Sequence, residues 1–118
     1  MGMLEIIIEI GDPAGTTFEE LQVIVDTGST NTVVPRQIPE RLGVPVTDTK
    51  PTRIADGSLI TSRIGDTIIR LEGQTFPTPV TFAEPGEPAV LGVIALERAA
   101  LAVDPLEQRL VPTNLMRL

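Results

Sequence analysis

The chain begins with a stretch in which apolar residues recur at every second position, from residue 4 to residue 10. This period of two is typical of a half-buried β-strand. A turn rich in glycine and proline follows at 11–15, and a second apolar stretch covers 18–25. Side chains alternate between the two faces of a strand, so Ile24 and Asp26 share one face of this second stretch. The pattern therefore predicts two consecutive strands, the second of which leads directly to an aspartate.

The rest of the chain alternates short apolar runs with turn residues. A strand is predicted at 32–35, and a short helical turn at 38–43 between a proline and a glycine. Asp56-Gly57 is a strong two-residue hairpin signal between strands at 51–55 and 59–64. The remaining predictions are strands at 67–71 and 79–82, an apolar run at 89–94, a helix at 95–102, a turn at 103–107 and a strand at 109–111. The expected class is mostly β with one helix near the C-terminus.

Length and composition indicate one domain, residues 1–118, with a core made of aliphatic side chains. The length suffices for one core and not for two. Tryptophan and tyrosine are absent, so valine, isoleucine and leucine must fill that core. Glycine and proline are frequent and spread along the chain, which suits short strands joined by turns.

Charge and residue types exclude several classes of function. The net charge of −7 argues against nucleic-acid binding, which needs a basic surface. No apolar run approaches the roughly 20 residues of a membrane span, and no basic-plus-apolar leader begins the chain, so we expect a cytoplasmic protein. Without cysteine or histidine there is no disulfide, thiolate zinc site or Ser-His-Asp triad. We expect no metal and no cofactor, and carboxylates are the main candidates for proton transfer.

The segment Asp26-Thr27-Gly28-Ser29-Thr30 is the strongest candidate for chemistry. A carboxylate at the end of a buried strand is costly unless the fold pairs it or uses it. Hydroxyls of Thr27 and Ser29 stand beside it, and Gly28 allows close approach of another backbone or of a substrate. The alternative is structural, because an aspartate before a glycine often hydrogen-bonds its own turn.

Three segments together resemble the retropepsin-like aspartic proteases, the single-lobe relatives of pepsin, and their bacterial members most. Asp26-Thr27-Gly28-Ser29 matches the family's first signature, and Val90-Leu91-Gly92, about 64 residues later, matches its second. Ala55-Asp56-Gly57-Ser58 lies where the family has its flap hairpin. The resemblance covers essentially the whole chain. It implies a small, closed, β-barrel-like acid protease lobe with one short C-terminal helix.

The resemblance also implies a mechanism and a partner. Members hydrolyse peptide bonds in extended segments with water held between two aspartates. One Asp-Thr-Gly per chain then requires a homodimer in which each subunit supplies Asp26. Thr27 would interlock the two signature loops, Gly28 would leave room for substrate, and Ser29 would hydrogen-bond the outer oxygen of Asp26. The hairpin at 55–58 would close over the peptide or protein substrate.

Several residues allow a second interpretation. Thr30 and Val93 stand where viral members carry an acidic residue and an arginine, which favours an alternative, a catalytically weak or inactive module for peptide binding or dimerisation. Gly92 has a purely structural alternative, close packing against the Asp26 loop. Glutamates 84 and 87 are interpreted as solvated charge. The terminal segments 1–5 and 113–118 are candidates for an interleaved dimer contact. Apolar side chains available to line a cleft, each equally a core candidate, are Ile24, Val34, Ile54, Val90 and Ile94.

Overall fold

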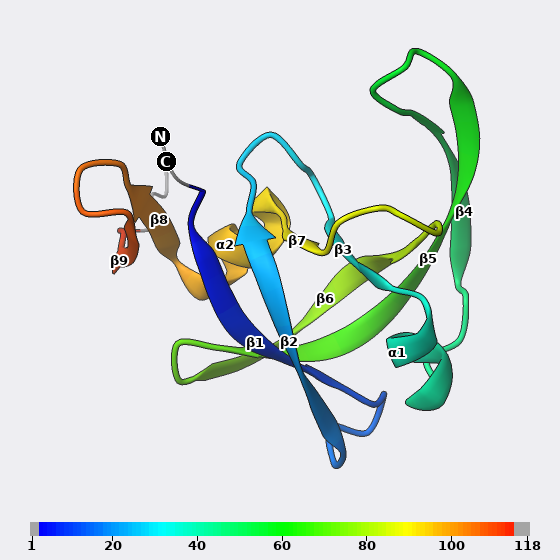
Figure 1. Ribbon diagram of the computed structural model, residues 1–118. Coiled ribbons are helices and arrows are strands. Elements are labelled where there is room, and N and C mark those ends of the chain that lie inside the picture. Colours follow the sequence, from blue (N-terminus) through cyan, green and yellow to red (C-terminus); the bar gives the residue numbers. More distant parts are fainter. Residues whose placement is uncertain (1–2, 115–118) are drawn as a thin grey trace, which may run out of the picture.

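A computed structural model describes residues 3–114, and most of them lie in strands (Figure 1). Of the terminal segments 1–5 and 113–118 that are candidates for a dimer contact, residues 1–2 and 115–118 lie outside the described residues. Strands are β1 (Glu5–Gly11), β2 (Phe18–Val25), β3 (Thr32–Pro35), β4 (Asp48–Arg53), β5 (Leu59–Leu71), β6 (Gln74–Ala83), β7 (Val90–Leu91), β8 (Leu101–Asp104) and β9 (Arg109–Pro112). Helices are α1 (Gln37–Arg41) and α2 (Val93–Ala99).

Seven strands form one sheet that returns on itself. Their order is β1-β2-β7-β3-β6-β5-β4, and β1 also pairs with β5, which closes six of the strands into a ring. The edge of β5 that faces away from β6 pairs with β4 over its first half and with β1 near its end. The β4–β5 hairpin therefore extends beyond the ring and projects from the body of the molecule (Figure 1).

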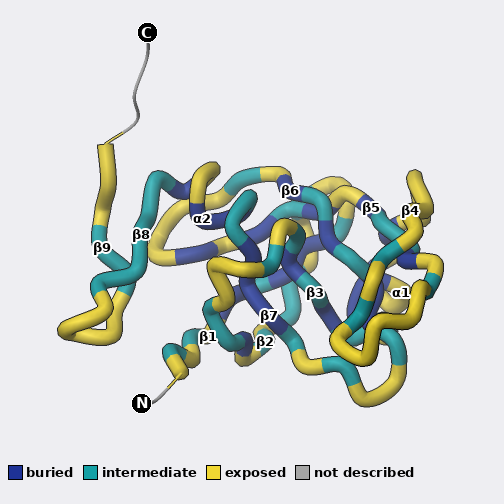
Figure 2. Tube along the Cα trace, turned by 90° about the horizontal axis from the view of Figure 1, so that it is seen from above, coloured by how far each residue is buried: buried dark blue, intermediate teal, exposed yellow. Residues whose placement is uncertain are grey.

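Aliphatic side chains fill the inside of the ring, as the composition predicts. The most buried large side chains come from several strands, among them Ile8, Ile10, Ile69 and Leu91. Figure 2 shows these buried segments inside, with exposed turns around them. Burying each such side chain contributes about 1.5–3 kcal/mol. The inner face of α2, with Ala95, Leu96 and Ala99, belongs to the same core.

The mostly β class, the C-terminal helix and the strands at 18–25 and 32–35 are confirmed. The two strands predicted at 59–64 and 67–71 are instead one, β5. Gly65 lies between the two predicted ranges and is a site of close packing, because a Cβ there would lie 2.5 Å from the Pro45 carbonyl oxygen. Strands β4 and β6 also begin earlier than predicted, at Asp48 and Gln74.

The C-terminal helix is displaced from its predicted range of 95–102. It begins at Val93 and ends at Ala99, because Ala100 adopts the left-handed conformation (φ 53°). Leu101 and Ala102 were predicted to be helical and lie in β8 instead, paired with Pro112 and Val111 of β9. Val103 and Asp104, predicted as a turn, belong to the same strand. The pairing with β9 outweighs the helix propensity of the alanine-rich segment.

Candidate functional site

Asp26 follows the last residue of β2 and lies beside the second signature. β2 pairs in parallel with β7, with Ile24 opposite Val90 and Val25 opposite Leu91. The backbone N–H of Asp26 donates to the Leu91 carbonyl oxygen at 3.0 Å, which continues this pairing by one residue. Two segments about 64 residues apart in sequence thus meet side by side.

The side chain of Asp26 is exposed in the single chain, although it ends a strand of the core sheet. Its Oδ1 accepts a hydrogen bond from the Gly28 N–H at 2.9 Å, and its backbone carbonyl accepts one from the Ser29 N–H at 3.1 Å. Among the described residues, Oδ2 has no hydrogen-bond partner. The turn contact that sequence analysis offered as a structural alternative is therefore present, and it leaves one carboxylate oxygen free.

The side chain of Ser29 makes a different hydrogen bond from the one expected. Ser29 was expected to hydrogen-bond the outer oxygen of Asp26, but its hydroxyl donates to the Asn31 carbonyl oxygen at 2.8 Å. Ser29 thereby stabilises the turn that follows the aspartate. Thr27 and Gly28 are exposed, so both are accessible to a second molecule.

Gly92 is packed directly against the loop that carries Asp26. A Cβ at residue 92 would lie 2.4 Å from the Asn31 carbonyl oxygen and 2.9 Å from that of Ser29. No side chain fits at such distances, so glycine is required here. The packing role that the sequence left as an alternative for Gly92 is present in the structure.

Backbone donors at the start of α2 hold the same loop. The N–H groups of Val93 and Ile94 donate to the carbonyl oxygens of Ser29 and Thr30, at 2.8 and 3.1 Å. The first N–H groups of a helix have no partner within the helix, so these bonds satisfy two of them. The loop therefore has little freedom to change the position of Asp26.

The Gly92 N–H, one residue earlier, donates to the hydroxyl oxygen of buried Thr32 at 3.1 Å. This bond ties the second signature to β3, the strand that follows the Asp26 loop. The loop is consequently held from both of its ends.

A cleft of about 1140 Å³ adjoins this loop. Its walls are the loop residues 28–31, the β4–β5 hairpin and the β6–β7 connection at 84–88. Part of its floor is a row of neighbouring residues, Val33, Thr81 and Ile64, on β3, β6 and β5. The cleft thus lies between three segments that are distant from one another in the sequence.

The hairpin tip has a longer loop than the two-residue turn predicted from Asp56-Gly57. The β4–β5 ladder ends at the pair Arg53 and Leu59, so five residues form the tip. Gly57 adopts a positive φ of 88°, and the Arg53 guanidinium donates to its carbonyl oxygen at 2.6 Å. The Ser58 hydroxyl and N–H both donate to Asp56 and lower the pKa of that carboxyl below its ordinary value. The tip is thus held by its own side chains.

The structure brings most of the predicted site residues together. Segments 26–29 and 90–92 are in contact, and Gly28, Ser29, Ala55 and Asp56 line the same cleft. Of the apolar side chains offered as cleft residues, Ile54 lines it, whereas Val34 and Val90 are buried in the core.

Sequence reasoning missed four charged side chains of the cleft, Lys50, Arg53, Glu84 and Glu87. The glutamates were interpreted as solvated charge, and no local pattern shows that their loop faces the hairpin. For Lys50 a signal exists, because it alternates with Thr52 and Ile54 along β4 and so shares their face.

Residues 3–114 contain no group of three potential metal ligands, and no helix in this range is long and apolar enough to cross a membrane. The site therefore consists of a carboxylate, hydroxyls, backbone groups and an adjoining cleft.

Comparison with known proteins identifies a family. A family model described as aspartyl protease matches residues 8–95, well over half of the chain. The matched range includes the Asp26 loop, the β4–β5 hairpin and the β7 segment with Gly92. No curated protein matches the chain.

Proposed function

The chain belongs to the aspartyl protease family, within its retropepsin-like group, and from this membership we propose that it is a homodimeric aspartic endopeptidase. Peptide hydrolysis of this kind needs two carboxylates at one water molecule. The chain has a single Asp-Thr-Gly segment, so the second carboxylate must come from a second copy. A two-fold axis beside Asp26 would bring the same residue of both subunits together.

The observation that carries the proposal is the exposure of Asp26 on an otherwise fixed loop. Its backbone is bonded to Leu91, its Oδ1 to Gly28, and the loop behind it to α2. A rigid scaffold with an accessible carboxylate is what a shared site requires, because catalytic groups must be held close to their working geometry. The adjoining cleft has room for an extended peptide.

In the proposed reaction the two Asp26 carboxyls share one proton. Like charges at such short range do not both ionise, so one carboxyl holds the proton while the other is ionised. The ionised carboxylate accepts a proton from water as the water attacks the peptide carbonyl carbon. The protonated one donates to the carbonyl oxygen. Thr27 would interlock the two loops, Gly28 would admit the substrate backbone, and the hairpin tip would exclude bulk water.

The decisive test is Asp26→Asn. The amide oxygen of asparagine can still accept the hydrogen bond from the Gly28 N–H, so the fold should be retained. Cleavage of a peptide library, followed by mass spectrometry, should fall to background, and circular dichroism should match the wild type. A statine-like mimic of the tetrahedral intermediate should inhibit the wild type. Cleavage that survives in the Asn variant would refute the assignment.

The second candidate is a peptide-binding or dimerisation module with weak or no catalysis. It is favoured by Thr30 and Val93, which replace residues that support substrate and dimer contacts in viral members. This function predicts a dimer that binds extended peptides, with equal affinity in the wild type and in Asp26→Asn, and releases them intact. The same library with mass spectrometry separates the two candidates.

A further inference from the structure

Lys50 is the only lysine of the chain, and it lies in the cleft. It is in the middle of β4, where it pairs with Ser62 of β5. Side chains two residues apart share a face of a strand, so Lys50 is on the same face as Thr52 and Ile54, which also line the cleft. The ammonium group therefore stands on the hairpin wall, along the path of an extended peptide.

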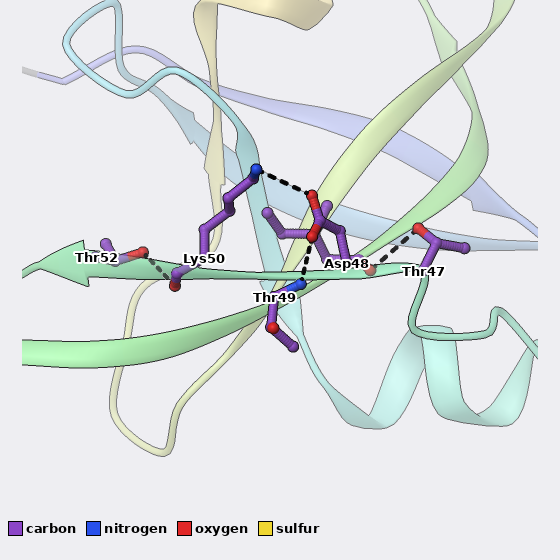
Figure 3. Close-up of polar contacts among 6 residues, drawn as sticks. Thr47, Asp48, Thr49, Lys50 and Thr52 are labelled. Carbon is purple, nitrogen blue, oxygen red and sulfur yellow. Dashed lines mark hydrogen bonds and ion pairs between the residues drawn. The ribbon is translucent and has the colours of Figure 1, made fainter.

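Among residues 3–114, the ammonium group has only one weak ion-pair partner. Its Nζ lies 3.4 Å from Asp48 Oδ2, and both side chains are more than half exposed (Figure 3). The other oxygen of Asp48 accepts the Thr49 N–H at 2.8 Å. Exposed pairs of this kind contribute about 0–1 kcal/mol. A second carboxylate that enters the cleft can therefore compete for Lys50 at little cost.

Two hydroxyls lie on the hairpin wall beside Lys50, one on its strand neighbour Thr52 and one on its cross-strand partner Ser62. The oxygens of Thr52 and Ser62 are 2.7 Å apart, and Ser62 is only 6% exposed although it lines the cleft. One of the two hydroxyl protons lies between these oxygens. Among the described residues, the other proton has only a long contact of 3.4 Å, from Thr52 to the Lys50 carbonyl oxygen, so this hydroxyl can rotate and donate to a better acceptor. Ile54 and Ile60 also line this wall, so Lys50 and the two hydroxyls are polar groups among apolar ones.

The other charged groups of the cleft make this spot distinct. Arg53 is already bonded to the Gly57 carbonyl oxygen, and Asp56 to Ser58. Glu84 and Glu87 belong to the loop at 84–88, which also lines the cleft. A negative side chain near that loop would be repelled, whereas one beside Lys50 would be attracted.

We propose that Lys50, with the hydroxyl pair of Thr52 and Ser62, makes the cleft select an extended peptide that carries a carboxylate side chain at one position. The inference rests on the proposed function for the peptide as occupant, and it adds a specificity-determining residue. A carboxylate can accept hydrogen bonds from an ammonium and a hydroxyl at the same time. An amide of the same shape is neutral and forms weaker hydrogen bonds with these donors. At the remaining positions, neutral or basic side chains are favoured by the glutamates and by the net charge of −7.

The experiment measures binding without relying on cleavage. The Asp26→Asn protein is titrated with ten-residue synthetic peptides of alternating apolar residues, in which one position carries Glu or Gln and is moved along the peptide. At one position Glu should bind about fivefold more tightly than Gln, as expected for an ion pair in a partly open cleft. The additional change Lys50→Gln should abolish this ratio, and Lys50→Glu should invert it.

Two controls separate the role of Lys50 from general charge. Arg53→Gln removes another cation of the same strand and should leave the Glu/Gln ratio at that position unchanged, while Asp48→Asn removes the competing carboxylate and should raise it. Equal affinity for Glu and Gln at every position, or a ratio that persists in Lys50→Gln, would overturn the inference. Absence of binding by any peptide would do so as well. Wild-type protein that cleaves no peptide, with the Glu preference intact, would refute only the proposed protease function.

Discussion

The Cα of Gly92 lies so close to the backbone of Asn31 that a Cβ on residue 92 would stand 2.4 Å from the Asn31 carbonyl oxygen. This contact joins the second signature to the loop that carries Asp26. Because the loop also accepts two hydrogen bonds from the start of α2, its position depends on this packing. The position of the proposed catalytic carboxylate is therefore set by Gly92 and the start of α2, which do not line the cleft.

Gly92→Ala should distort the Asp26 loop and destabilise the fold. Backbone atoms of Asn31 and Ser29 must move to admit the methyl group, and overpacking of this kind costs about 1–3 kcal/mol. Thermal unfolding should show a lower midpoint, and peptide cleavage should fall more than the folded fraction does. Gly73→Ala is a matched control, since its Cβ would meet nothing within 4 Å and only its positive φ is unfavourable. Equal stability of the two variants would contradict this account of Gly92.

Thr32→Val should weaken the same region through a lost hydrogen bond. Thr32 is 1% exposed, and its hydroxyl oxygen accepts the Gly92 N–H at 3.1 Å. Valine has nearly the same shape but no acceptor, so the buried N–H would lose its partner at a cost of about 1–3 kcal/mol. Urea unfolding should show this as a lower midpoint with an unchanged slope. Thr32→Ser keeps the hydroxyl and should lose less; a larger loss for Ser than for Val would rule out the hydrogen bond as the cause.

Mixing wild-type chains with Asp26→Asn chains should reduce activity if the site is shared. After subunit exchange at equal concentrations, about half of the wild-type chains sit in mixed dimers with one intact carboxylate. Cleavage should then drop to about half of that of the wild type alone at the same wild-type concentration. Specific activity should also fall on dilution, since dissociation separates the two halves of the site. Activity that is unchanged by mixing and by dilution would mean that each chain acts alone.

The hairpin tip should keep its order in weakly acidic solution and lose it only in stronger acid. The pKa of Asp56 is lowered by the hydroxyl and the N–H of Ser58, so the ionised form favours the folded tip. A carboxyl whose pKa is lower in the folded chain than in the unfolded chain stabilises the folded state at pH values above its unfolded pKa. This stabilisation is lost as the pH falls through the folded pKa, below about pH 4. Carbon-detected NMR titration should place Asp56 below its ordinary value. Ser58→Ala should raise the pKa, and a titration insensitive to that change would remove Ser58 as its cause.

Local pattern alone determined a large part of this protein. Alternation of apolar residues predicts the first strand, and short apolar runs between turn residues predict those at 18–25 and 32–35. The absence of histidine and cysteine limits proton transfer mainly to carboxylates, and the Asp-Thr-Gly segment identifies Asp26 among them. Local pattern gave a wrong prediction where pairing with another strand determines the backbone conformation. Residues 59–71 form the single strand β5 rather than two strands, and the helix predicted at 95–102 ends at Ala99.

Only the tertiary structure decided what lies next to Asp26. The parallel pairing of β2 with β7 and the contact of Gly92 with Asn31 join residues about 60 positions apart, and such backbone contacts leave no local periodicity to detect. The same holds for the cleft, which Lys50 of β4 and Glu84 of the β6–β7 connection line together. A sequence pattern reports which face of a segment is buried. It does not report which other segment buries it, because that depends on hydrogen bonds and packing between distant parts of the chain.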